Sequence, residues 1–326
     1  MQLAIADFCV DLRHGIKSAI GNRKCLIVGC GYVGLPLGGE LVRLGHEVFG
    51  LRRNPAAKNE LKAAGIQPLC ADVTRPDTLV KLPGEFDWVV NCVAAGGGAD
   101  DYRQVYLQGT RNLIDWLAPN PPKKFVYTSS TSVYGQNDGS LVKESSPAEP
   151  LAETAKVLIE TEKVLLESGG SRVCSPHQKI PAVILRVAGI YGPDRGHWFK
   201  QFLKDEARME GDGSRFLNMI HRDDVVGCII AALKNGRPGE AYNAVDDEPV
   251  SQLHFFQWLA QSLDKPLPPC EPENPAENRK RGVTNKRVSN RKLKMELGYQ
   301  FKYPNFRKGY SAELLRLDRL SIKPDL

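Results

Sequence analysis

The sequence has few of the patterns that mark membrane, metal-binding or repeat proteins. No stretch approaches the ~18 consecutive apolar residues of a membrane-spanning helix, and neither a C-x-x-C pair nor a Cys/His cluster with metal-ligand spacing occurs. Internal repeats and long low-complexity tracts are absent as well. The net charge of +6 is mild for 326 residues, so it suits an anionic ligand without requiring nucleic acid. We therefore expect a globular protein without a metal site or a membrane segment.

The N-terminus and the cysteines bear on where the protein resides. Asp7 and Asp11 interrupt residues 1–24, and no small-residue cleavage site follows an apolar core, so a signal peptide is not indicated. We expect an N-terminal extension there, either an amphipathic helix or the remnant of a targeting segment. The cysteines in apolar runs are Cys25, Cys70, Cys92 and Cys228. They predict buried free thiols in a reducing compartment, hence the cytoplasm or a soluble organelle compartment such as the plastid stroma.

Short apolar runs alternate with helical patterns through the first half of the chain. The runs predict strands over Cys25–Val28, Glu47–Leu51, Gln67–Ala71, Trp88–Val93, Lys124–Thr128 and Val183–Val187. The helical patterns cover Leu35–Leu44, Pro55–Ala64, Asp101–Leu117 and Leu151–Ser168. Most of the runs are apolar throughout, as in strands that are covered on both faces. The alternation predicts an α/β fold with a doubly wound parallel sheet.

The second half is less regular. Amphipathic helices are predicted over Asp224–Lys234 and over Ser251–Leu263, where Ser251 is a suitable N-cap. The Pro-rich, acidic stretch Lys265–Asn278 predicts an irregular surface connection.

A glycine-rich loop follows the first predicted strand and leads directly into a helix. Its G-x-G-x-x-G residues are Gly29, Cys30, Gly31, Tyr32, Val33 and Gly34. Gly29 permits the tight turn, Gly31 lets the backbone approach a pyrophosphate, and Gly34 lets the helix pack on the strand. The helix N-terminus then offers free N–H groups to the phosphates. This context predicts dinucleotide binding.

The end of the second predicted strand indicates which dinucleotide is bound. NAD sites usually place an acid there, whose carboxylate binds the ribose 2′-OH, whereas here the strand ends in Arg52 and Arg53. Two guanidinium groups suit a 2′-phosphate, so we predict NADP, with NAD the less favoured cofactor. The alternative is that both are solvated surface arginines.

Several further segments, in order, resemble the extended short-chain dehydrogenase/reductases, the NAD-dependent epimerase/dehydratase superfamily. They are Phe125–Gly135 ("SS-x-x-VYG"), Leu185–Pro193 ("LR-x-x-x-x-YGP"), Ile220–Val225 ("IH-x-x-D-V") and Ala241–Ala244 ("YN-V"). The resemblance implies a Rossmann domain over 25–190, completed by parts of 221–250, and a mainly substrate-binding lobe over 191–326. It also implies cofactor contacts from Asp72 and Val73 near the adenine and from Ala94 and Ala95 beneath the cofactor.

The sequence departs from this family at the catalytic pair Y-x-x-x-K. Lys156 matches the lysine, which holds the nicotinamide ribose, but Ala152 occupies the position of the tyrosine, which is the general acid/base. Ser130 matches the catalytic Ser/Thr and is expected to orient a substrate oxygen. Tyr134 is a candidate replacement acid, or else it packs in the core. The candidate catalytic residues are thus Ser130, Tyr134 and Lys156.

Other departures argue against the family's usual substrates. Thr131 and Ser132 replace the Asp-Glu pair of dehydratases, and Leu217 stands where epimerases place an arginine that grips a diphosphate. Tyr106 replaces a usual asparagine. These changes resemble a divergent, atypical branch of the family.

Some residues have both a functional and a structural interpretation. His221 and Asp224 are expected to be structural, at the start of a helix. Cys30 is either redox-sensitive, through the helix N-terminus, or simply small. A basic stretch comprises Arg279, Lys280, Arg281, Lys286, Arg287, Arg291, Lys292 and Lys294. It lacks interleaved aromatics, so nucleic-acid binding is not expected.

Two functions follow from these observations. The first is an NADP-dependent oxidoreductase or epimerase acting on a small hydroxyl or carbonyl compound. The alternative is a non-catalytic NADP-binding sensor or scaffold subunit. A homodimer is implied only by the resemblance, through the helices over Asp101–Leu117 and Leu151–Ser168.

Overall fold

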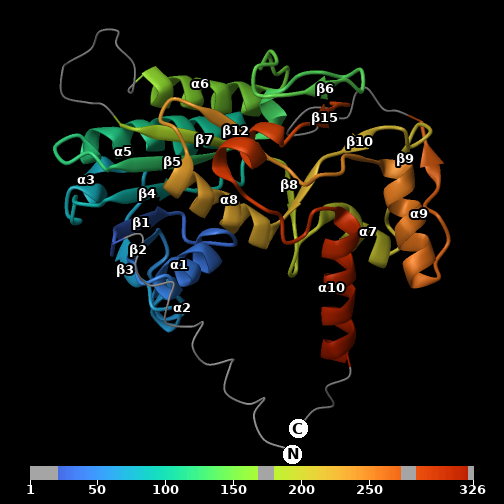
Figure 1. Ribbon diagram of the computed structural model, residues 1–326, viewed down its shortest axis with the longest axis horizontal. Coiled ribbons are helices and arrows are strands. Elements are labelled where there is room, and N and C mark those ends of the chain that lie inside the picture. The colour runs from blue at the N-terminus through green and yellow to red at the C-terminus, as the bar shows by residue number, and fades with distance from the viewer. Residues whose placement is uncertain (1–20, 168–179, 273–283, 322–326) are drawn as a thin grey trace, which may run out of the picture.

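The computed structural model of the protein describes residues 21–167, 180–272 and 284–321, although it leaves the side chains of 318–321 undescribed. The predicted N-terminal extension therefore lies almost wholly outside the described residues, as do the end of the expected connection 265–278 and the end of the expected helix 151–168. Figure 1 shows a large α/β body and a smaller lobe beside it.

Seven parallel strands form the central sheet. They are β1 (Lys24–Val28), β2 (Glu47–Arg52), β3 (Gln67–Cys70), β4 (Trp88–Asn91), β5 (Lys124–Ser130), β7 (Ala182–Val187) and β12 (Ala241–Ala244). Their order is β12-β7-β5-β4-β1-β2-β3, and every neighbouring pair is parallel. The predicted α/β fold with a parallel sheet is confirmed.

Helices cover both faces of this sheet (Figure 1). One face carries α1 (Gly34–Arg43), α2 (Lys58–Ala63) and α8 (Arg222–Asn235); the other carries α3 (Pro76–Leu79), α5 (Gly109–Leu117) and α6 (Glu153–Glu167). Successive residues of β1 point to opposite faces, so Ile27 packs in the cluster with Leu37 of α1, and Leu26 packs in the cluster with Leu113 of α5. The continuously apolar strand β1 is thereby buried on both sides.

Within the described residues, the lobe combines short strands with three helices around an aromatic core. Its elements are β8 (Gly189–Tyr191), α7 (His197–Leu203), β9 (Met209–Glu210), β10 (Phe216–Leu217), β11 (Met219–His221), β13 (Val250–Ser251), α9 (Gln252–Leu263), β14 (Cys270–Glu271) and α10 (Phe306–Ser321). Phe255 and Tyr310 are buried at its centre, with ring centroids 5.5 Å apart. The predicted N-cap is confirmed, because the Ser251 hydroxyl accepts a hydrogen bond from the His254 N–H at 3.2 Å.

Short elements connect these parts. They are η2 (Pro55–Ala57), η4 (Thr131–Val133), β6 (Leu141–Val142), β15 (Arg287–Val288) and η5 (Leu293–Leu297).

Three sequence-based expectations need correction. The helix predicted over Asp101–Leu117 is wound in three ways, as α4 (Ala99–Tyr102), the π-helical segment η3 (Arg103–Gln108) and α5. The helix predicted over Pro55–Ala64 begins as the 3-10 turn η2. Cys70 is exposed rather than buried, because β3 is the edge of the sheet and is covered less completely.

Candidate functional site

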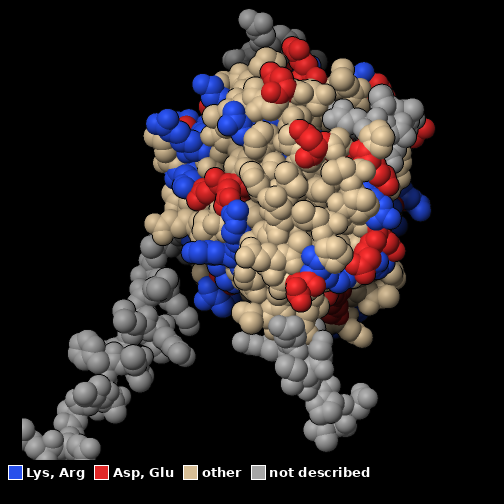
Figure 2. Space-filling model, turned by 90° about the vertical axis from the view of Figure 1, so that its right-hand side faces the viewer, with Lys and Arg blue, Asp and Glu red and all other residues tan. Residues whose placement is uncertain are grey.

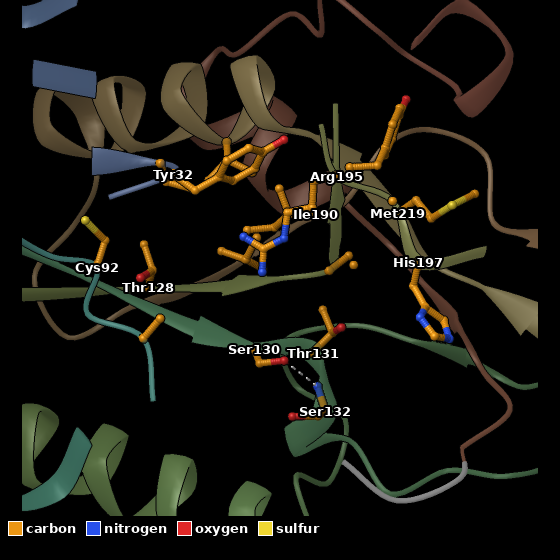
Figure 3. A pocket seen from close by; sticks show the side chains of 18 of the residues that line it. Tyr32, Cys92, Thr128, Ser130, Thr131, Ser132, Ile190, Arg195, His197 and Met219 are labelled. Carbon is orange, nitrogen blue, oxygen red and sulfur yellow. Dashed lines mark hydrogen bonds between the residues drawn. The ribbon is translucent and has the colours of Figure 1, made fainter. Parts of the chain in front are cut away.

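A cleft of about 1650 Å³ lies between the sheet and the lobe. Its floor is formed by the loops that follow β1, β2, β3, β4, β5 and β7, which is where ligands bind in open parallel sheets. Figure 3 shows Ser130, Thr131 and Ser132 on one side of the cleft and Tyr32 and Arg195 across from them. Residues from both halves of the chain therefore face one cavity.

The glycine loop has a geometry that larger residues would disturb. Gly29 has φ +90°, and a Cβ on it would lie 2.7 Å from the backbone of Val93. A Cβ on Gly34 would lie 2.5 Å from the carbonyl oxygen of Gly29, so the helix packs directly on the turn. A Cβ on Gly31 would meet nothing within 4 Å. Residues 29–33 line the cleft, and the open space above Gly31 suits the close approach of a pyrophosphate.

The loop's cysteine, Cys30, is buried. Burial raises the pKa of the Cys30 thiol to about 12, although the charge of Arg52 lowers it. The side chain is fully buried, so Cys30 packs as a small residue in the core.

Arg52 and Arg53, at the end of β2, differ in their partners and in their exposure. Arg52 donates from Nη1 to the Cys30 carbonyl (3.3 Å) and to Glu60 (3.0 Å), so part of its charge is neutralised. Arg53 is exposed and lines the cleft beside Asn54. No acidic residue occupies the end of β2 itself.

The other candidate cofactor residues lie along the same floor. Asp72, Val73 and Ala94 line the cleft. Asp72 accepts hydrogen bonds at Oδ1 from the backbone N–H and hydroxyl of Thr74, which fixes the turn after β3. Ala95 is not among the lining residues; its N–H donates to the Tyr106 hydroxyl oxygen at 3.3 Å. Tyr106 belongs to the π-helical segment and does line the cleft, a contribution that the sequence pattern did not indicate.

Ser130 ends β5 and faces the cavity. Its Oγ accepts a hydrogen bond from the Ser132 N–H at 3.2 Å and so caps the turn η4. Because that bond uses an oxygen lone pair, the Ser130 hydroxyl hydrogen remains available to a ligand oxygen. Thr128 and Thr131 line the same wall.

The structure does not bring the other two candidate catalytic residues into the cleft. Tyr134 is fully buried, and its hydroxyl donates to Asn243 at 2.8 Å while accepting from Arg186 at 2.8 Å. Lys156 is exposed and pairs with Glu153 at 2.7 Å. Leu158 of the same helix lines the cleft; two residues correspond to about 200° of rotation on a helix, so Lys156 points away from the cavity. Burial in the core and these hydrogen bonds to Asn243 and Arg186 hold Tyr134 in place.

A buried ionic network lies behind Ser130. Glu162 of α6 pairs with Arg186 of β7, and the Ser129 hydroxyl donates to Glu162 at 2.5 Å. Arg186 extends the network to Tyr134 and Asn243. Since each group belongs to a different element, the network fixes β5, β7, α6 and β12 relative to one another.

His221 and Asp224, which we expected to be structural, hold neighbouring segments in place. His221 accepts a hydrogen bond at Nδ1 from the Asp223 N–H and caps α8, and burial lowers its pKa. Asp224 is fully buried and accepts from the Tyr299 hydroxyl and from two backbone N–H groups, at 2.7–2.9 Å.

The lobe contributes basic side chains to the cleft. Arg195 stacks on the ring of Tyr32, with 4.9 Å between its Cζ and the ring centroid, and so links the lobe to the glycine loop. Arg215 and Lys286 line the cleft further into the lobe. The sequence showed Lys286 only as one member of a basic stretch, because the fold alone brings residues 215 and 286 together.

The rest of that basic stretch does not form a continuous positive surface in the described part of the chain. Lys292 pairs with Glu240 (2.6 Å) and Lys294 with Asp247 (2.9 Å). Arg279, Lys280 and Arg281 lie outside the described residues. On the face shown in Figure 2, acidic side chains lie among the basic ones. A nucleic-acid interface would require a more uniform charge.

Within the ranges 21–167, 180–272 and 284–321, no helix is long and apolar enough to cross a membrane. In the same ranges, no group of three His, Cys, Asp or Glu side chains is placed to hold a metal.

The chain is similar in sequence or in fold to several known proteins. Protein YeeZ of Escherichia coli K12 is 29% identical over 290 residues, which span 87% of this chain and 97% of YeeZ. A functionally unknown conserved protein from Silicibacter pomeroyi has 29% identity and a TM-score of 0.72, covering 91% of this chain and 99% of that one. The UDP-glucuronic acid 4-epimerase of Bacillus cereus, solved with UDP-glucuronic acid and NAD, has 24% identity and a TM-score of 0.75, covering 91% and 99%. This last likeness shows the fold alone.

The family model "NAD dependent epimerase/dehydratase family" matches residues 25–244, the region that holds the sheet, the glycine loop and Ser130. Because this region is more than half of the 326 residues, the chain belongs to the NAD dependent epimerase/dehydratase family.

Proposed function

We propose that the protein is an NADP-dependent oxidoreductase or epimerase that acts on a small hydroxyl or carbonyl compound. The observation that carries this proposal is that Ser130 faces the same cleft as the open glycine loop. A nicotinamide dinucleotide would supply or accept a hydride there, as the family relationship implies.

Ser130 would hydrogen-bond the substrate oxygen and hold the reacting carbon in place. With an alcohol substrate, the bound dinucleotide would accept the hydride from the reacting carbon, and the O–H proton would pass to solvent. The Tyr134 hydroxyl is buried and bonded to Asn243 and Arg186, so it would take no part in this proton transfer. Lys156 likewise takes no part, because it pairs with Glu153 on the outer side of α6.

The preference for NADP rests on the charge at the end of β2. Arg53 lines the cleft, and the part of the chain described here shows no ion pair to its guanidinium, whereas Arg52 is partly neutralised by Glu60. A 2′-phosphate near Arg53 would form charge-assisted hydrogen bonds. Titration calorimetry with NADPH and NADH tests this. We expect about tenfold tighter binding of NADPH, which Arg53→Ala removes without weakening NADH.

Equal affinity for the two cofactors would overturn the NADP preference alone. Binding of neither would overturn the oxidoreductase proposal. Lys58→Ala is a suitable control, because Lys58 is an exposed cation in the same region that does not line the cleft.

A second candidate is a non-catalytic NADP-binding sensor or scaffold subunit. It is favoured by the placement of Tyr134 and Lys156 outside the cleft, which leaves Ser130 without either of its expected partners. It predicts NADPH-dependent capture of partner proteins and no turnover on a broad panel of carbonyl and hydroxyl compounds. Turnover that Ser130→Ala abolishes would exclude it.

We also propose a homodimer through the helices that follow β4 and β5. Arg103 and Glu160 already pair across these helices at 2.7 Å on an exposed face. Light scattering of the purified protein would give twice the mass of one chain if the proposal holds, and the mass of one chain if it fails.

A further inference from the structure

Lys286 is a buried cation whose hydrogen-bond partners are all neutral. Its side chain lines the cleft although the residue is only 4% exposed. Nζ donates to the carbonyl oxygen of Tyr134 at 2.8 Å and to the Thr284 hydroxyl at 2.7 Å. Among the described residues, no carboxylate lies within ion-pair distance of it. Buried charges in proteins are normally paired, so the missing partner points to a ligand.

A second cation lies beside it. Arg215 lines the same part of the cleft and pairs through Nη1 with Glu210 at 2.6 Å, but its Nε is buried and has no hydrogen-bond partner among the described residues. Burial, and to a smaller extent the charge of Arg215, lowers the pKa of Lys286 to about 8. Glu210 compensates the charge of Arg215, but no carboxylate among the described residues compensates Lys286, so this part of the cleft keeps a net positive charge that an anion would balance.

The backbone holds this pair in place independently of any ligand. The Phe216 N–H donates to the Asn285 side chain at 3.0 Å, and the Asn218 side chain donates to the Lys286 carbonyl at 2.8 Å. The segment that bears Arg215 is therefore tied to the segment that bears Lys286. A preformed site of this kind needs little reorganisation when an anion enters.

We propose that Lys286 and Arg215 form a subsite for an anionic group of the substrate, either a carboxylate or a phosphate. Lys286 is bonded to the carbonyl of Tyr134, the residue that ends the turn begun by Ser130. The anion would thus lie on the lobe side of the reacting oxygen. The substrate is then a hydroxy or oxo compound that carries a carboxylate or a phosphate. This assignment of the anion to a substrate rests on the proposed function, but the anion site itself does not.

The purely structural alternative is that Lys286 only fastens its segment to the end of η4. In that case its removal would weaken the fold without changing anion affinity. The two explanations differ in one measurable quantity, the affinity of the folded protein for a simple anion.

The test is titration calorimetry of the full chain with inorganic phosphate and, separately, with malonate. We expect one of the two to bind, which identifies the preferred anion, and we expect Lys286→Met to weaken that binding about tenfold or more. Lys286→Arg should retain most of it. Lys308→Met is the matched control, because Lys308 is exposed on α10 and does not line the cleft.

The proposal is overturned if the wild type binds neither anion, or if Lys286→Met binds as tightly as the wild type. If Lys286→Met does not fold, as judged by circular dichroism, Arg215→Met is used and the same weakening is expected. NADPH is titrated into the same samples. If the wild type does not bind NADPH, the proposed function is overturned. The difference in anion affinity between the wild type and Lys286→Met reports on the anion site alone.

Discussion

Glu162 and Arg186 form a buried ion pair, with 2.7 Å between Oε2 and Nη2, directly behind the wall of the cleft that bears Ser130. Two further contacts of 3.2 Å join Arg186 Nε to the same carboxylate. Arg103 and Glu160 form a pair of similar length, but on the exposed surface. Glu160 and Glu162 lie two residues apart on α6, so the pairs permit a direct comparison of the same interaction in two surroundings.

We predict that Glu162→Gln lowers the free energy of unfolding by about 3–5 kcal/mol, because it leaves the Arg186 guanidinium buried without a counter-charge. Glu160→Gln should cost no more than about 1 kcal/mol, since water screens the exposed pair. Urea unfolding of both variants checks this. Equal losses of unfolding free energy in the two variants would show that burial does not make the Glu162–Arg186 pair harder to break than the exposed pair.

Two glycines of α1 give a second prediction. Gly34→Ala should lower the free energy of unfolding by roughly 1–3 kcal/mol, because its Cβ would lie 2.5 Å from the carbonyl oxygen of Gly29 and the backbone must shift. A Cβ on Gly39, in the same helix, would meet nothing within 4 Å. Gly39→Ala should therefore raise the free energy of unfolding by about 0.5–1 kcal/mol. Thermal melts of the two variants should move in opposite directions. A neutral Gly34→Ala would contradict the close packing of the loop.

The fold could be predicted because its signals are local. The run from Cys25 to Val28, the glycine loop and the Ser251 cap each depend on a few neighbouring residues, and each is where the sequence placed it. The π-helical segment at Arg103–Gln108 was missed, since one extra residue in a turn leaves the apolar pattern almost unchanged. The exposure of Cys70 depends on the order of the strands in the sheet, and an apolar run in the sequence does not reveal that order.

The site was less predictable because it is assembled from distant segments. Tyr134 follows Ser130 closely in sequence, but the acceptor of its hydroxyl is Asn243, 109 residues away. Lys156 occupies the expected position in the chain, yet the rotation of α6 directs it outward. Lys286 is 152 residues from the carbonyl that it contacts. Motif spacing carries no information about such partners.

Ser130 provides a prediction about activity. On a panel of hydroxyl and carbonyl compounds, Ser130→Ala should lower kcat about a hundredfold by removing the group that orients the substrate oxygen. Cofactor affinity should not change. Stability should fall by about 1 kcal/mol, because the cap of η4 is lost. Ser289→Ala serves as the control, because the Ser289 hydroxyl accepts the same kind of bond, from the Arg291 N–H, and does not line the cleft. Undiminished turnover by Ser130→Ala would assign the chemistry to another residue.

Lys286 gives a prediction about pH. Its pKa falls from 10.5 in the unfolded chain to about 8 in the fold, chiefly through burial. Below pH 8 both states hold the proton, and folding bears the full cost of burying the charge. Between pH 8 and 10.5 the unfolded state binds more protons than the folded state, so this residue's contribution to stability rises with pH. The stability of the wild type relative to Lys286→Met should therefore increase by on the order of 2–3 kcal/mol from pH 7 to pH 10.5. Urea unfolding of both proteins across this range, with Lys308→Met as a control that stays parallel to the wild type, checks the prediction. A constant difference would mean that the Lys286 ammonium is not desolvated in the folded protein.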